Sequence, residues 1–164
     1  MQLEGSCRCG AVRFRVEADC PAPYQRCYCS ICRKTAGGGG FAINLGALAE
    51  TLAVDGETAV ARYSASIPGP HGESAVSPAR RAFCGYCASA LWVFDPRWPE
   101  LIHPFASAAD SVLPTPPEVV HIMLRHAASW CDVPPRGTPG HRHFDGYPDE
   151  SLRDWHQRHG LLER

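Results

Sequence analysis

Short runs in which apolar and polar residues alternate recur along the chain. In the clearest run, residues 11–16, the apolar Phe14 and Val16 alternate with Arg13 and Arg15. Alternation at period two is typical of a β-strand with one buried face. Similar runs occupy residues 41–45, 58–63, 81–84, 91–94 and 119–124. The pattern predicts a mainly β protein built from short strands.

Glycine and proline, 15 of each, punctuate these runs. Residues 68–72 (PGPHG) predict an exposed turn, because proline has no backbone N–H for a central strand ladder. Residues 133–140 contain three prolines and two glycines, which predict an extended connector.

One helix is predicted near the end of the chain. Leu152, Trp155 and His159 fall on one helical face. Asp149 or Ser151 can cap the N-terminus, and a C-terminal cap is expected at Gly160. We expect this helix to pack back on the same domain.

Length and charge narrow the class of protein. The 164 residues, 45% of them hydrophobic, suffice for one compact domain. Sixteen basic and 17 acidic residues give a formal net charge of -1, so the basic surface that nucleic acid or an anionic membrane requires is not expected. The N-terminus has no signal pattern, and no apolar run approaches the roughly 18 residues of a spanning helix. These features predict a cytoplasmic protein without nucleic-acid or membrane partners.

Nine cysteines are the strongest chemical signal in the sequence. In a reducing compartment, metal binding explains so many cysteines better than disulfides do. Seven of them form three clusters: Cys7 and Cys9; Cys27, Cys29 and Cys32; Cys84 and Cys87. Thiolates two or three positions apart can reach one ion at the roughly 2.3 Å of a zinc–sulfur bond. Cys20 and Cys131 stand alone and are interpreted as structural or incidental.

Counting ligands suggests a division of these clusters into two sites. A structural zinc takes four protein ligands, which the two pairs supply together, and three ligands define an open site, which the triplet supplies by itself. Two alternatives stay open. The triplet could close by recruiting Cys20, Cys131 or a histidine, or only one zinc could bind while the other cysteines are small buried apolar residues.

Three sequence blocks resemble one known family. Residues 5–10 (GSCRCG), 27–34 (CYCSICRK) and 83–87 (FCGYC) are similar in order and spacing to the signature blocks of the glutathione-dependent formaldehyde-activating family, which includes centromere protein V. His121-Ile122 and Ser129-Trp130 are similar to its weaker final block. The resemblance covers roughly residues 3–131.

The resemblance implies a β-tent fold with two zinc ions. It implies a structural zinc on Cys7, Cys9, Cys84 and Cys87, and a catalytic-type zinc on Cys27, Cys29 and Cys32. It also implies a carbon-sulfur lyase activity that joins glutathione and formaldehyde into S-hydroxymethylglutathione. Under this interpretation, residues 1–131 are the zinc-binding domain, and residues 132–164 are a connector and helix packed on it.

One departure from the family pattern concerns the last cysteine pair. Ala88 stands where the family usually has glycine. A turn with positive φ costs more in alanine than in glycine, so we expect a slightly altered turn with its metal retained.

The triplet suggests a mechanism. An open zinc would lower the pKa of a thiol cosubstrate, and the thiolate would attack a carbonyl carbon. Arg33 and Lys34, which follow the triplet, could offset its negative charge or hold a glutathione carboxylate, although both could equally be solvated. The four glycines that begin at Gly37 could let the backbone approach the ligand, or could serve only as a connector.

Other aromatic and histidine residues are assigned less specific roles. Trp92 and Trp130 are interpreted as core residues rather than pocket walls. His141 and His143 have ligand-like spacing but are expected to form an exposed surface pair, since the cysteines already supply two sites.

Two functional hypotheses follow from the sequence. The first is a zinc-dependent enzyme that handles adducts of glutathione, or another thiol, with formaldehyde or a related aldehyde. The second is a non-catalytic binding module stapled by zinc. They differ in whether the triplet keeps an open position for a thiol.

Overall fold

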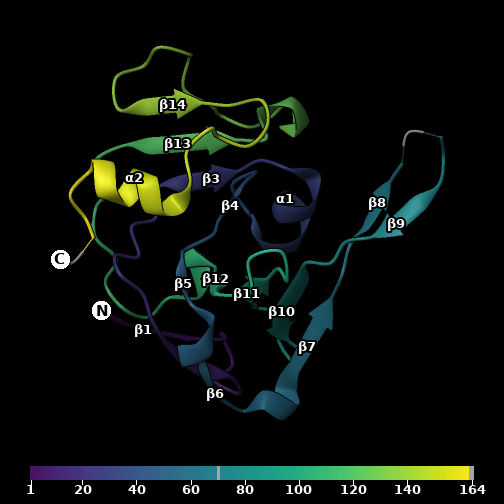
Figure 1. The fold of residues 1–164 in the computed structure, drawn as a ribbon. Helices are drawn as coiled ribbons and strands as arrows, with labels where there is room; N and C mark the ends of the chain where they lie inside the picture. Colours follow the sequence, from purple (N-terminus) through teal and green to yellow (C-terminus); the bar gives the residue numbers. More distant parts are fainter. Residues whose placement is uncertain (70, 163–164) are drawn as a thin grey trace.

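Four small β-sheets make up the protein in the computed structural model, which describes residues 1–69 and 71–162 (Figure 1). The first sheet is antiparallel, in the order β1-β2-β6, and the second has five antiparallel strands in the order β5-β12-β11-β10-β7. Their strands are β1 (Gln2–Ser6), β2 (Arg13–Glu17), β6 (Ala53–Asp55), β5 (Ala47–Leu48), β12 (Leu101–Pro104), β11 (Ala90–Phe94), β10 (Arg80–Cys84) and β7 (Val60–Tyr63).

The third sheet has the order β14-β13-β3-β4, and β13 is parallel to both of its neighbours. A separate hairpin of β8 and β9 projects from the body of the molecule (Figure 1). The strands are β14 (His141–His143), β13 (Val119–Ile122), β3 (Gln25–Cys27), β4 (Ala42–Ile43), β8 (Ser66–Pro68) and β9 (Ser74–Val76).

Helices are short in the described part of the chain. The α-helices are α1 (Ser30–Ala36) and α2 (Leu152–Arg158), and the 3-10 helices are η1 (Ala49–Thr51), η2 (Glu57–Ala59), η3 (Ala106–Ala108) and η4 (Leu124–His126). Across residues 1–69 and 71–162, no helix has the length and apolar character that crossing a membrane requires.

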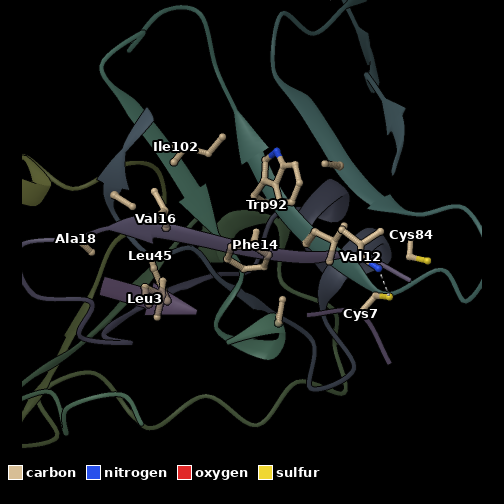
Figure 2. Packing of buried hydrophobic residues seen from close by; sticks show 14 of the residues in the cluster. Leu3, Cys7, Val12, Phe14, Val16, Ala18, Leu45, Cys84, Trp92 and Ile102 are labelled. Atoms are coloured by element: carbon tan, nitrogen blue, oxygen red, sulfur yellow. Dashed lines mark hydrogen bonds between the residues drawn. The ribbon is translucent and has the colours of Figure 1, made fainter. Parts of the chain in front are cut away.

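One hydrophobic core lies between the first two sheets. Phe14 of β2 contacts Trp92 of β11 edge to face, with ring centroids 5.5 Å apart. Figure 2 shows Leu3, Val16 and Ile102 in the same cluster. The sulfurs of Cys7 and Cys84 lie at one end of this core, so two of the clustered cysteines are attached directly to the packed interior.

A second core lies under the third sheet and receives α2. Tyr24, just before β3, stacks on Trp155 with centroids 3.6 Å apart. The Trp155 indole N–H donates to the Glu118 carboxylate at 3.0 Å. Burial of Trp155 is nearly complete at 1% exposure, so the C-terminal helix contributes to the interior rather than only covering it.

The mainly β architecture predicted from alternation is confirmed. Arg13 and Arg15 are exposed while Phe14 and Val16 are buried, as expected for β2. The predicted run at 58–63 begins instead with η2, and the run at 119–124 ends in η4. The PGPHG turn joins β8 to β9, although Pro70 itself lies outside the described residues.

The predicted C-terminal helix is also confirmed. Of the two candidate caps, Ser151 occupies the N-cap and accepts a hydrogen bond from the Asp154 N–H. Gly160 follows the helix with φ of 67°, the left-handed conformation that glycine favours after a helix. The sequence patterns missed α1, which contains Cys32 of the triplet and is capped by Cys29.

Candidate metal centres

The two cysteine pairs meet at one end of the first core. Cys7 and Cys9 flank the turn from β1 to β2, whereas Cys84 ends β10 and Cys87 follows one turn later. Their four sulfurs all lie within 4.8 Å of one another. The Sγ atoms of Cys7 and Cys9 are 3.5 Å apart, and those of Cys9 and Cys84 are 3.7 Å apart.

This geometry fits a tetrahedral zinc ion. Four sulfurs at roughly 2.3 Å from one ion are separated by about 3.8 Å, close to the distances between these sulfurs. The Val12 N–H donates to Cys7 Sγ at 3.2 Å, a contact that favours a thiolate. All four cysteines are free of disulfides. The donor set and spacing therefore suit a closed four-thiolate metal site.

Ser89 organises the turn after the second pair. Its hydroxyl lies 3.2 Å from Cys87 Sγ and accepts a hydrogen bond from the Arg8 N–H at 3.0 Å. Hydrogen bonds from the Ser89 side chain and backbone lower the pKa of Cys87 to about 5. Ala88 has φ of 59°, as its replacement of glycine led us to expect. Alanine therefore bears the strain of a left-handed backbone conformation in this turn.

The triplet is formed by a strand end and the start of α1. Cys27 is the last residue of β3, Cys29 is the N-cap of α1, and Cys32 is buried in its first turn. Cys29 Sγ accepts a hydrogen bond from the Cys32 N–H at 3.3 Å. The three sulfurs lie within 4.8 Å of one another. Helix capping by a cysteine thus turns neighbouring sulfurs toward one point.

Hydrogen bonding inside the triplet separates the acidities of its thiols. Hydrogen bonds from Cys27 and Cys32 lower the pKa of Cys29 to about 2, whereas the hydrogen bond to Cys29 raises the pKa of Cys27. Of the three thiols, only that of Cys29 has a lowered pKa. A group of three soft sulfur donors of this kind suits zinc.

Neither lone cysteine nor any histidine joins the triplet within that distance in residues 1–69 and 71–162. Cys131 instead directs its sulfur toward the carbonyl oxygen of Gly40, 3.7 Å away. The described protein groups thus present three ligands at this site.

The prediction that His141 and His143 form an exposed surface pair is wrong. Both residues are half-buried in β14, because this strand pairs in parallel with β13. His141 Nδ1 lies 3.0 Å from Nε2 of the fully buried His121, whose Nδ1 lies 3.0 Å from the Tyr28 hydroxyl. His141, His121 and Tyr28 thus form a continuous chain of polar contacts.

Comparison with known proteins decides the family. The model of the family described as "Glutathione-dependent formaldehyde-activating enzyme" matches residues 2–124. The chain belongs to this family. It is 60% identical over 163 residues to a Halomonas elongata protein named "Putative glutathione-dependent formaldehyde-activating enzyme", covering 99% of both chains. A crystal structure of a Rhodobacter sphaeroides protein aligns with a TM-score of 0.51 and 27% identity, covering 68% of this chain and 91% of that one.

In this member of the formaldehyde-activating family, a pocket of about 450 Å³ adjoins α1. Arg33, Lys34 and Gly37, the residues suggested for glutathione, all line it, opposite Ser89 and Ser107. The Nε atom of Arg33 is buried and has no hydrogen-bond partner among the described residues. A Cβ at Gly37 would lie 2.2 Å from the Phe41 carbonyl oxygen, so a side chain could not fit without moving the backbone. The glycine at this position is thus required by close packing.

The tryptophans differ from one another. Trp92 is 4% exposed, which confirms its predicted place in the core. Trp130 is 62% exposed, so its assignment to the core is wrong. It packs against the flat surface offered by Gly40, where only the absence of a side chain leaves room.

Sequence reasoning missed Arg81, which lies beside the triplet. Its Nη2 atom donates to Cys32 Sγ at 3.8 Å. Period-two alternation in β10 could not have indicated this burial, because Arg81 shares a strand face with Phe83, opposite the buried Ala82 and Cys84. The contact of Arg81 with the triplet could not be predicted, because it depends on how two segments that are distant in the sequence pack together.

Proposed function

We propose that the protein is a zinc-dependent enzyme of the carbon-sulfur lyase type that handles adducts of glutathione, or another thiol, with formaldehyde or a related aldehyde. The observation that carries this proposal is the convergence of three sulfurs, from Cys27, Cys29 and Cys32, without a fourth protein ligand among the described residues. Membership of the family and the name of the Halomonas elongata relative support the choice of reactants. Such chemistry, with nine free cysteines, suits the reducing cytoplasm.

The two cysteine clusters take different roles in this proposal. The four-cysteine cluster of Cys7, Cys9, Cys84 and Cys87 holds a structural zinc, since four thiolates complete its coordination. The triplet holds the catalytic zinc. Bound there, the ion would act as a Lewis acid toward a thiol sulfur and make the thiolate available near neutral pH.

The chain itself supplies binding and orientation. Arg33 and Lys34 offer two cations at the rim of the 450 Å³ pocket, a volume within the roughly 300–1,000 Å³ range of small-ligand sites. Glutathione carries two carboxylates, and an arginine can hold one through two parallel N–H bonds. The buried, unpartnered Nε of Arg33 is a donor for which such a carboxylate is a suitable acceptor. We therefore assign glutathione binding to Arg33, Lys34 and Gly37.

Native mass spectrometry of the reduced protein, with and without glutathione, tests the proposal. We expect two zinc ions per chain and a glutathione adduct that disappears in Cys29→Ala. Arg33→Gln should weaken the adduct and leave both zinc ions bound, which separates thiol binding from metal binding. A second zinc that binds no thiol, or one zinc only, would contradict the enzyme and favour the zinc-stapled binding module.

A further inference from the structure

Arg81 is a buried cation without a carboxylate partner in the described structure. Its side chain extends from β10, whose neighbours at this point are Tyr63 and Val93, and the residue is 8% exposed. Its Nε and Nη1 atoms are buried without a hydrogen-bond partner among the described residues. Its remaining nitrogen, Nη2, contacts the sulfur of Cys32.

A buried guanidinium requires a compensating charge. Arginine stays protonated in proteins, and a charge removed from water without a partner strongly destabilises the fold. Asp95, the one buried carboxylate among the described residues, is already bound through both oxygens by Arg97, at 2.6 to 3.2 Å. The sulfur that Arg81 contacts therefore identifies the triplet as its source of negative charge.

We propose that Arg81 is the fixed counter-ion of the triplet, a positioning residue that sets how firmly these three cysteines hold a metal and how readily the centre accepts an anionic thiol. This inference rests on the proposed function. Three thiolates and one divalent zinc sum to a charge of about -1, which one arginine brings to zero. A thiolate ligand would then raise the negative charge to about -1 rather than -2.

The four-cysteine cluster shows why the triplet in particular requires such a residue. Although Cys7 and Cys84 of that cluster are buried, Cys9 is exposed, so water reaches the cluster and screens the charge of its thiolates. Cys27 and Cys32 are buried, where the effective dielectric constant is lower and an uncompensated charge is more costly. Arg81 supplies beside the triplet what solvent supplies at the other cluster.

Chelator competition on the purified zinc-loaded protein tests the inference, with zinc per chain read by native mass spectrometry. Arg81→Met removes the charge while keeping an unbranched side chain, and Arg81→Lys restores the charge. Arg80→Met is the matched control, because Arg80 lies on the opposite face of β10, over the Phe94 ring. In Arg81→Met we expect the chelator concentration that removes the second zinc to fall at least tenfold. The first zinc should not change, Arg81→Lys should recover most of the loss, and Arg80→Met should match the wild type.

Cobalt substitution gives a second readout that does not depend on activity. Addition of glutathione to the cobalt-loaded wild type should strengthen the sulfur-to-metal absorption, and this change should require more glutathione in Arg81→Met. If Arg81→Met does not fold, Arg81→Gln, which keeps an N–H donor without the charge, takes its place in both experiments.

Two results would overturn the inference. Unchanged retention of the second zinc in Arg81→Met would show that the charge is not needed, while the proposed function would stand. If both zinc ions were removed more easily to the same extent in Arg81→Met, and Arg81→Lys did not restore their retention, Arg81 would be a packing residue only. A wild-type protein that never holds a second zinc would instead contradict the proposed function itself.

Discussion

The two cysteine clusters use the same ligand chemistry but are built differently. The four-cysteine cluster joins two turns, in which Cys9 and Cys84 are 75 positions apart in the sequence, and it lies partly in solvent. The triplet comes from one strand end and the helix turn that follows, and none of its cysteines is exposed. A metal in the first cluster would close a long loop of the chain, whereas a metal in the second would constrain only six residues, 27–32.

The two clusters are therefore expected to serve different purposes, one in the stability of the fold and the other in the chemistry. Closing a long loop removes entropy from the unfolded chain, so binding at the four-cysteine cluster contributes to the free energy of folding. A metal in the local triplet would contribute less to folding, and its three protein sulfurs would leave a coordination position for a ligand. The Cys7 and Cys84 sulfurs at the edge of the first core connect that metal site to the packing of both sheets (Figure 2).

The largest predicted effect is the loss of a single long-range ligand. Cys84→Ala should unfold the chain, because structural zinc contributes about 10–16 kcal/mol in small zinc domains, comparable to the roughly 5–15 kcal/mol total stability of a typical domain. Cys29→Ser should leave the chain folded and remove only the second zinc and any thiol-adduct activity. Circular dichroism and a zinc assay measure both outcomes.

Serine is the sharper choice at position 29 because Cys29 caps α1. A serine hydroxyl can still accept the Cys32 N–H, so the loss of metal is separated from the loss of the cap. Cys29→Ala should be less stable than Cys29→Ser by about 1 kcal/mol. If Cys84→Ala and Cys29→Ser unfold alike, the distinction between a stabilising and a chemical cluster is wrong.

The next effect concerns the C-terminal helix, which we propose belongs to the same folding unit as the triplet. Trp155→Ala should lower the free energy of unfolding by about 3–5 kcal/mol, because the lost aromatic side chain leaves a buried cavity beside Tyr24, the residue immediately before β3. Urea denaturation measures the loss, and Trp98→Ala, at a 42% exposed site, is the control.

Zinc release during the same titration extends the comparison. Because β3 ends at Cys27, we expect Trp155→Ala to lose the triplet metal at lower urea than the metal of the four-cysteine cluster. Simultaneous release of both metals would show that the helix supports the whole molecule equally.

Local patterns were sufficient for some parts of the fold and insufficient for others. The alternation around Phe14 and the capping signals around Ser151 depend on neighbouring residues, and both predicted their elements correctly. Helix α1 has only seven residues, too few for a periodic apolar face to be visible, and its cap is a cysteine rather than one of the usual capping residues. Its existence follows from packing rather than from propensity.

The residues of the candidate sites show the same limit. Cysteine spacing indicated the two pairs and the triplet, because the members of each are close in sequence, while ligand counting and the family resemblance suggested that the two pairs share one site. The contact of Arg81 with Cys32 spans 49 positions, and the pairing of His121 with His141 depends on the parallel register of β13 and β14. Neither contact has a signature in the sequence, since each arises only when distant strands come together.

Mild acidification should have a smaller effect on stability, through a histidine in the same sheet as the strand that leads into the triplet. Desolvation, followed by the charges of His143, Arg26 and His141, lowers the pKa of His121 to about 4. The unfolded chain binds a proton near pH 6.5 and the folded chain does not, so stability falls as the pH drops below that value. Lowering the pH from about 7.5 to about 5.5 should therefore decrease the free energy of unfolding by about 1.4 kcal/mol through this histidine.

The matched variant for this effect is His121→Gln, which keeps a polar side chain without the titration. The difference in unfolding free energy between the two pH values should be smaller in His121→Gln than in the wild type by that amount. Both proteins keep all nine cysteines, so acid weakening of the metal sites contributes equally to both. Identical pH dependence in the two proteins would show that His121 can be protonated in place.

The smallest predicted effect is a gain in stability on the side of the four-cysteine cluster. Ala88 has φ of 59°, where an L side chain costs roughly 1–2 kcal/mol, and part of this strain is offset because glycine loses more entropy on folding. Ala88→Gly should therefore stabilise the protein by about 0.5–1 kcal/mol in urea denaturation and leave both zinc ions bound.

The control is Ala90→Gly in the extended strand β11, where glycine should destabilise the protein by about the same amount. A gain in stability from Ala88→Gly together with a loss from Ala90→Gly would locate the strain in the turn between Cys87 and Ser89. Equal loss of stability at both would mean that contacts of the Ala88 methyl group outweigh its backbone strain.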